Sequence, residues 1–231
     1  MTEKACILAL DAAGNACSAA LWSGGAVRAR RLETMERGQS ERLVPMIEDV
    51  MTEAAVGYDQ LTLVAVTVGP GGFTGVRIGL ATARAIALAC ACPAMGVTTF
   101  EAAAAAVDAE ERQGLPLVAL IESKRKELYA QTVWRPGDSP GDPAALLPEQ
   151  LAGALPSGPL LLVGDGAERG AEALRRAGRM DLTVRAHGPI DAAVLAQLAA
   201  ERPLPPHGAL PPAPLYLRAP DVTPGRRSPS P

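Results

Sequence analysis

The sequence has only two histidines among its 231 residues, and neither is placed as a metal ligand usually is. His187 and His207 stand alone in loop-like sequence and form no pair at ligand spacing with a carboxylate. Protein metal centres gather several such side chains, so we expect no catalytic metal. No serine lies in a Gly-x-Ser-x-Gly context, and the sequence suggests no Ser/His/Asp arrangement.

Paired cysteines are missing as well. Cys6, Cys17, Cys90 and Cys92 show no Cys-x-x-Cys spacing and lie in apolar surroundings. This pattern favours small buried side chains in a reducing compartment over a redox or metal role.

The chain also has no excess of basic charge and no long uninterrupted apolar run. Its net charge is −3, so the sequence lacks the excess of basic residues that is typical of proteins that bind nucleic acid. Arg77 and Arg84 interrupt the longest apolar stretch, so we expect no membrane span. The acidic residue in the leading segment MTEKACILAL is not typical of a signal peptide. We therefore expect a cytoplasmic protein, and the apolar fraction of 48% is ample for a packed core.

The most informative stretch begins at Val64 and predicts a strand, a glycine-rich turn and a helix. Val64–Val68 is apolar, and Gly69–Gly72 can continue neither a strand nor a helix. Such a turn can cradle an anion with its backbone N–H groups, or it can simply be a tight connection. It lacks the Gly-Lys-Ser/Thr of a phosphate-binding P-loop, and no lysine occurs between Lys4 and Lys124.

The helix predicted from Phe73 to Cys90 carries a ridge of very small side chains. Gly75, Gly79 and Ala83 recur every four residues, and two helix-interior glycines cost roughly 1 kcal/mol each relative to alanine. Close approach of another element would offset that cost. Because this helix is apolar almost all round, we expect its own sheet on one side and a partner protein on the other. Packing inside a single-chain core is the alternative.

The order of elements predicts an α/β fold with two similar units. Residues 1–113 follow the order β-β-β-α-β-α-β-α, with Ser40 as N-cap of the first helix and Thr98/Thr99 as caps of a helix reaching about Arg112. Residues 114–222 open with a hairpin and continue with strands and helices, the last one capped by Asp191. Residues 223–231 are proline-rich and are expected to be disordered.

Asp11 is the first candidate for chemistry, because it ends the first strand and precedes a glycine-containing turn. In actin-like and sugar-kinase-like ATPases, such a carboxylate and the small hydroxyl residues after it hold magnesium and phosphate. Here Ala12 and Ala13 follow, and they offer no hydroxyl group. The weak candidates for a nucleotide site are Asp11, Gly71, Gly72, Phe73, Thr74 and Gly75.

Several segments resemble the TsaB (YeaZ) family, the non-catalytic subunit of the bacterial tRNA threonylcarbamoyladenosine machinery. The specific one is VGPGGFTGVRIGLATARAIAL. ILALDAAGNACSAAL, GQSERLVPMIEDVM, LVALIESKRKELYAQ, LLVGDGAE and PLYLRAPDVTP support it by order and spacing. Two positions depart from the family pattern: Asp11-Ala12-Ala13 replaces Asp-Thr-Ser or Asp-Thr-Ala, and Gln39 stands where relatives often have histidine.

The resemblance implies an actin-like (ribonuclease H-like) fold of two duplicated βββαβαβα-type domains around a cleft, with a degenerate nucleotide site. It implies a scaffold without catalytic residues or a cofactor of its own, and ATP or ADP only at an interface with a partner. The partners would be the catalytic paralogue TsaD and the ATPase TsaE, acting on adenosine 37 of tRNAs that read codons beginning with A. Transfer RNA would be reached only through the complex. Family members also self-associate, and the sequence leaves both a monomer and a homodimer open for the isolated chain.

The same family implies a helical bundle between partners, which maps onto residues 40–56 and 73–90. The interface residues predicted there are Leu43, Met46, Ile47, Val50, Gly75, Val76, Gly79, Leu80 and Ala83. Two alternatives stay open. One is a small actin-fold ATPase or kinase that uses Asp11 and the Gly69–Gly75 turn, and the weaker one is a glycoprotease-like peptidase.

Overall fold

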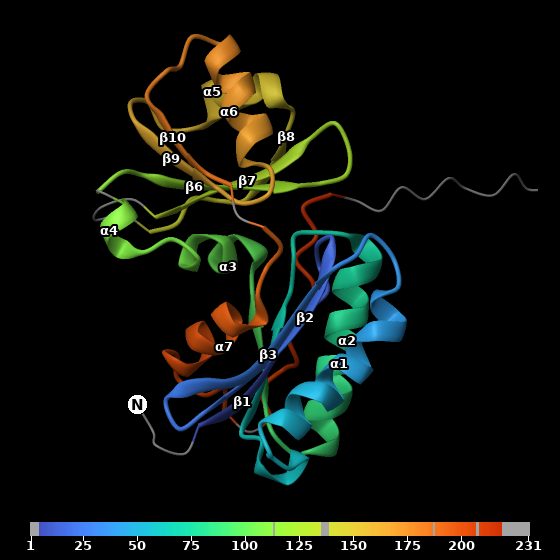
Figure 1. Cartoon of the computed structure of the whole chain (residues 1–231). Helices are drawn as coiled ribbons and strands as arrows, with labels where there is room; N and C mark the ends of the chain where they lie inside the picture. The colour runs from blue at the N-terminus through green and yellow to red at the C-terminus, as the bar shows by residue number, and fades with distance from the viewer. Residues whose placement is uncertain (1–4, 113, 135–138, 187, 207, 219–231) are drawn as a thin grey trace, which may run out of the picture.

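The computed structural model describes residues 5–112, 114–134, 139–186, 188–206 and 208–218. It contains two mixed five-stranded sheets, in the orders β3-β2-β1-β4-β5 and β10-β9-β6-β7-β8 (Figure 1). The first sheet consists of β1 (Cys6–Asp11), β2 (Ala16–Ser23), β3 (Ala26–Thr34), β4 (Leu63–Thr67) and β5 (Ala94–Val97). The second consists of β6 (Leu117–Glu122), β7 (Leu128–Trp134), β8 (Ala144–Leu146), β9 (Leu160–Val163) and β10 (Leu182–Arg185).

The two sheets repeat one topology. In each, the first three strands are antiparallel neighbours, and the last two lie parallel to the first. The helices complete the pattern β-β-β-α-β-α-β-α twice. They are α1 (Gln39–Glu53), α2 (Phe73–Ala89) and α3 (Thr99–Ala105) in the first half, and α5 (Leu151–Ala154), α6 (Ala167–Arg176) and α7 (Ala192–Ala200) in the second. The predicted α/β class with duplicated units is confirmed. The short strand β8 was missed, because three half-buried residues after a proline-glycine loop carry no clear pattern.

The last helix of each half leaves its own sheet and lies between the two sheets (Figure 1). Helix α3 contacts β6 and β7 of the second sheet, and α7 packs on the first sheet through Ala192, Leu195 and Ala196. The predicted range 114–222 therefore includes a helix that contributes to the core of the first sheet. The boundaries at 113/114 and 222/223 stay predictions, and residues 219–231, with the predicted disordered tail, lie outside the described residues.

Two predicted helix limits were wrong. Helix α1 begins at Gln39, with Gly38 at the N-cap position (φ +94°) and no side-chain cap, so Ser40 lies inside the helix. Thr98 does cap α3, and it forms a capping box with Glu101. That helix ends at Ala105, and a separate turn, α4 (Ala109–Arg112), follows the fully buried Val107.

The residues predicted as a partner interface lie inside the fold. All except the half-buried Gly75 are buried. Seven of them, Leu43, Met46, Ile47, Val50, Val76, Leu80 and Ala83, belong to the core between the α1/α2 layer and the first sheet. The small ridge of α2 therefore faces its own sheet, which is the alternative that the sequence left open.

The glycines of this ridge are needed for close backbone contact. A Cβ atom at Gly75 would lie 1.9 Å from the carbonyl oxygen of Ala12, and one at Gly71 would lie 2.4 Å from that of Ala13. Neither oxygen can turn away, because both belong to the backbone between β1 and β2. At Gly79 a Cβ would be 3.4 Å from Val66 Cγ2, which leaves no room for a larger side chain.

We predict that Gly75→Ala lowers the free energy of unfolding by about 1–3 kcal/mol or more, the usual cost of overpacking a filled site. Gly153→Ala is the matched control, because a Cβ atom at this helical position meets nothing within 4 Å. That variant should be neutral or slightly stabilising, by up to about 1 kcal/mol. Urea unfolding followed by circular dichroism measures both. Equal stabilities of the two variants would contradict the backbone contact at Gly75.

Candidate functional site

The glycine turn closes directly over the end of β1. The N–H of Gly72 donates to the carbonyl oxygen of Ala13 at 2.7 Å, while the Ala12 carbonyl lies against Gly75. Two backbone carbonyl oxygens thus occupy the space before the N-terminus of α2, where an anion would bind. The structure brings the predicted turn and Asp11 together, but it places the Ala12–Ala13 backbone over them.

Asp11 is fully buried at the end of β1. Its Oδ1 accepts hydrogen bonds from the Thr67 hydroxyl and from the Ala13 N–H, the latter at 3.2 Å, whereas its Oδ2 has no partner. Burial raises the pKa of Asp11 to about 6, against the lowering effect of these hydrogen bonds. A carboxylate in this position cannot reach a ligand in solvent. Sequence reasoning missed Thr67, which looked like an ordinary end of a buried strand.

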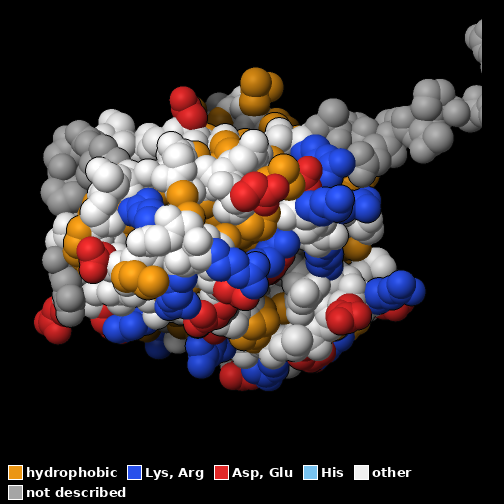
Figure 2. Space-filling view, turned by 90° about the horizontal axis from the view of Figure 1, so that it is seen from above, with side chains coloured by type: hydrophobic (Ala, Val, Ile, Leu, Met, Phe, Trp, Pro, Cys, Tyr) orange, Lys and Arg blue, Asp and Glu red, His pale blue; other side chains and the backbone are white. Residues whose placement is uncertain are grey.

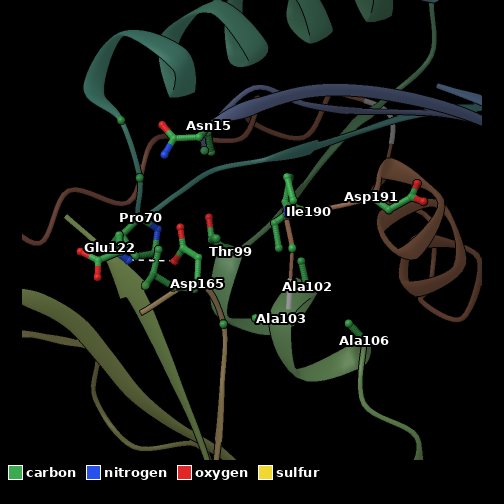
Figure 3. A pocket seen from close by; sticks show the side chains of 18 of the residues that line it. Asn15, Pro70, Thr99, Ala102, Ala103, Ala106, Glu122, Asp165, Ile190 and Asp191 are labelled. Carbon is green, nitrogen blue, oxygen red and sulfur yellow. Dashed lines mark hydrogen bonds between the residues drawn. The ribbon is translucent and has the colours of Figure 1, made fainter. Parts of the chain in front are cut away.

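Beside this sealed turn, a cavity of about 420 Å³ lies between the two sheets (Figure 3). Its polar lining includes Thr99 at the start of α3, Glu122 at the end of β6, and Asp165 in the turn after β9. The Glu122 N–H donates to Asp165 Oδ1 at 2.9 Å, and the Glu122 carboxylate forms an ion pair with Arg169 Nε at 3.0 Å. None of these residues was predicted as a site residue. Only the Gly164-Asp165-Gly166 turn carried a signal, because glycines on both sides of an aspartate mark a close-packed turn.

The electrostatics of this cavity favour carboxyl groups that are harder to ionise than usual. Desolvation raises the pKa of Asp165, against backbone hydrogen bonds and the charge of Lys124. Desolvation also raises the pKa of Glu122, against the attraction of Arg169. Within the described ranges, no three His, Cys, Asp or Glu side chains come close enough together to hold a metal ion.

A second surface feature lies on the outer side of α1 and α2, away from the sheet. Val44 is 51% exposed on α1, and Leu88 is 84% exposed on α2. A groove of about 880 Å³ runs between the two helices, lined by Val44, Ile47, Glu48, Tyr58, Asp59, Ala81, Thr82, Ala85, Ile86 and residues 89–91. This outer face, rather than the ridge, is the part of the helix pair that another protein can reach. None of the helices in the described part of the chain has the length and hydropathy that a membrane crossing needs.

Comparison with known proteins finds similar sequences and similar solved structures. Residues 33–145 match the sequence model of TsaD, described as tRNA N6-adenosine threonylcarbamoyltransferase. The tRNA threonylcarbamoyladenosine biosynthesis protein TsaB of Escherichia coli is 38% identical over 124 residues, which are 53% of this chain and 52% of that protein. The chain therefore matches about half the length of this curated relative.

Two solved structures extend the similarity over most of the chain. YeaZ from Pseudomonas aeruginosa has a TM-score of 0.71 at 28% identity, covering 85% of this chain and 91% of that one. A protein described as having similarity to peptidase YeaZ from Pseudomonas aeruginosa has a TM-score of 0.75 at 26% identity, covering 93% and 100%. The predicted resemblance to the TsaB (YeaZ) family is confirmed.

We predict that Asp11→Asn removes a pH dependence of stability. The folded-state pKa of about 6 exceeds the unfolded value, so the wild-type protein loses stability as the pH rises from about 4 to about 6. The loss amounts to about 3 kcal/mol at most. Asp11→Asn should lack this component, and chemical unfolding at several pH values between 4 and 8 measures it. The exposed Asp181 gives the control variant Asp181→Asn, which should keep the wild-type profile. If the wild type and Asp11→Asn had identical profiles, the pKa of Asp11 would not be raised in the folded protein.

Proposed function

We propose that this chain is the scaffold subunit of a tRNA-modifying complex that forms N6-threonylcarbamoyladenosine at adenosine 37. Sequence and structural similarity to proteins named TsaB and YeaZ supports the pathway. The observation that supports a non-catalytic role is the closed glycine turn, in which the Ala12 and Ala13 carbonyl oxygens take the place of a phosphate. An actin-like fold in which this turn is closed keeps its architecture, but it cannot bind the phosphates of a nucleotide at the turn.

The outer face of α1 and α2 is the proposed partner surface. Val44, Ala81, Ala85 and Leu88 are exposed on it, and small residues along the groove leave space for a helix of the partner. We propose a TsaD-like catalytic paralogue as this partner, with a TsaE-like ATPase joining the complex. In isolation, the same face would pair two copies of the chain. ATP or ADP would bind, if at all, where this chain meets its partner.

Transfer RNA is proposed to reach this chain only within the complex. The net charge is −3, and the face seen in Figure 2 carries basic and acidic side chains intermixed rather than one basic surface. Nucleic-acid affinity depends on clustered Lys and Arg that neutralise phosphates. The weaker alternatives have less support: Asp11 is sealed from solvent, as an ATPase would not allow, and the described residues hold no metal-ligand cluster for a metallopeptidase.

The direct experiment reconstitutes the modification with purified TsaD-like and TsaE-like proteins, tRNA, ATP and an activated threonylcarbamoyl donor. Formation of threonylcarbamoyladenosine should require this chain, and mass spectrometry of digested tRNA measures it. Full activity without the chain would overturn the proposal.

We predict that Leu88→Asp weakens association with the TsaD-like protein at least tenfold, because it places an unpaired carboxylate in the contact. The fold should be unchanged, since Leu88 is 84% exposed, whereas Met46 is fully buried and its replacement would unfold the chain. Met180→Asp is the control, at a 72% exposed apolar residue in the second half of the chain. Pull-down and light scattering measure association. Normal association of Leu88→Asp would place the interface elsewhere.

We also predict no ATP hydrolysis above background by the purified chain with magnesium. The N-terminus of α2 is covered by carbonyl oxygens, and the Asp11 carboxylate has no path to a metal in solvent. A coupled phosphate-release assay measures turnover. Steady hydrolysis that disappears in Asp11→Ala, but persists in Asp181→Ala, would favour the ATPase alternative.

A further inference from the structure

The cavity between the sheets contains a buried hydroxyl group that nothing satisfies. Thr99 is only 5% exposed, and its Oγ1 has no hydrogen-bond partner. The backbone N–H of the same residue is used, since it donates to the Gly69 carbonyl oxygen at 2.8 Å. Buried polar atoms are nearly always paired in folded proteins, so an unpaired one that lines a cavity points to a ligand group.

Asp165 lies at the same end of the cavity, and its carboxylate is seen beside the Thr99 side chain (Figure 3). One of its oxygens accepts from the Glu122 N–H. The neighbouring Pro70 also lines the cavity and has no N–H to donate. This end therefore offers a carboxylate and a hydroxyl group, both able to accept hydrogen bonds.

Most other charged side chains that line the cavity are paired. Glu122 forms an ion pair with Arg169, and Asp191 forms one with Arg30 at 2.7 Å. Lys124 and Asp165 are both exposed, but Lys124 also lines the neighbouring hollow near Phe73. The charged group beside the Thr99 hydroxyl is the Asp165 carboxylate (Figure 3).

The remaining walls are mostly apolar, with Asn15 and Thr34 as further polar lining residues. Helix α3 contributes Ala102 and Ala103, Ala106 follows at its C-cap, and the opposite side contributes Ile190 and Val194. Alanine side chains give a wall without projections, which suits the flat body of a ring. The volume of about 420 Å³ lies within the range of ligand pockets, which combine an apolar lining with a few placed polar groups.

We infer that this cavity binds a small organic cation, with a primary ammonium group at Asp165 and Thr99 and a flat apolar body along α3. A phosphate group does not fit at the glycine turn, because the carbonyl oxygens of Ala12 and Ala13 lie at the N-terminus of α2. The inference does not depend on the role in tRNA modification, since it rests on a cavity that the α1/α2 surface does not share.

The test uses tryptamine as the probe, with tryptophol as its neutral match and indole-3-acetate as its anionic match. Calorimetry or ligand-observed NMR on the full chain measures binding. Tryptamine should bind at least tenfold more tightly than tryptophol, as expected when a hydrogen-bonded charge is lost. Tighter binding of indole-3-acetate would overturn the inference and assign the site to Lys124. Absence of binding by all three compounds at millimolar concentration would also overturn it.

Two near-isosteric variants locate the site. Asp165→Asn should weaken tryptamine at least tenfold with little effect on tryptophol, and Thr99→Val should weaken it severalfold. Glu168→Gln and Thr52→Val are matched controls at exposed positions outside the cavity lining, and they should bind as the wild type does. Circular dichroism checks that each variant folds. If Thr99→Val does not fold, Ala106→Phe tests the same site, because a ring at this exposed wall position should abolish binding. Unchanged affinity in folded Asp165→Asn would show that the amine binds elsewhere.

Discussion

The structure depends on one kind of backbone contact: a glycine-rich turn after the fourth strand of each half lies against the end of the first strand. In the first half, Gly72 donates to the Ala13 carbonyl, and Gly75 leaves no space for a Cβ atom. In the second half, Gly166 donates to the Leu120 carbonyl at 2.9 Å, and a Cβ at Gly164 would lie 2.4 Å from the same oxygen. The duplicated topology thus repeats its tightest contact, and in both halves glycine is required because backbone meets backbone.

The exchange of helices α3 and α7 joins the two halves through apolar packing. Phe100 of α3 is buried against the second sheet's core, whereas Leu195 of α7 is buried in the first sheet's core. Because α3 packs on the second sheet and α7 packs on the first, these two helices fix the width of the cavity between the halves. The cavity therefore persists although the turn at its edge is closed.

Sequence reasoning succeeded where one residue type had one physical meaning. The glycine turn, the α2 helix and the Thr98 cap were all correct because glycine, proline and a threonine cap constrain the backbone locally. Asp11 was named as a candidate from its place at the end of a strand, but its burial depends on a turn some sixty residues away that closes over it. The packing of α7 on the first sheet was missed for the same reason. The sequence shows that α7 has an apolar face. It does not show which of the two sheets this face packs on, because that depends on the path of the chain.

Most of the residues predicted for the partner interface lie in the core of the chain itself, and the reason bears on where a partner surface is proposed. A ridge of glycine and alanine shows that something approaches closely, but it does not show whether the neighbour is the chain itself or another protein. Here the neighbour is the β1–β2 turn and β4, so the cost of the helix-interior glycines is offset inside the fold. No similar account exists for Leu88, which stays 84% exposed on a helix whose inner side is already packed. Together with Val44, Ala81 and Ala85 it forms an exposed apolar face on the helix pair, and this face, rather than one residue, is the reason to propose a partner there.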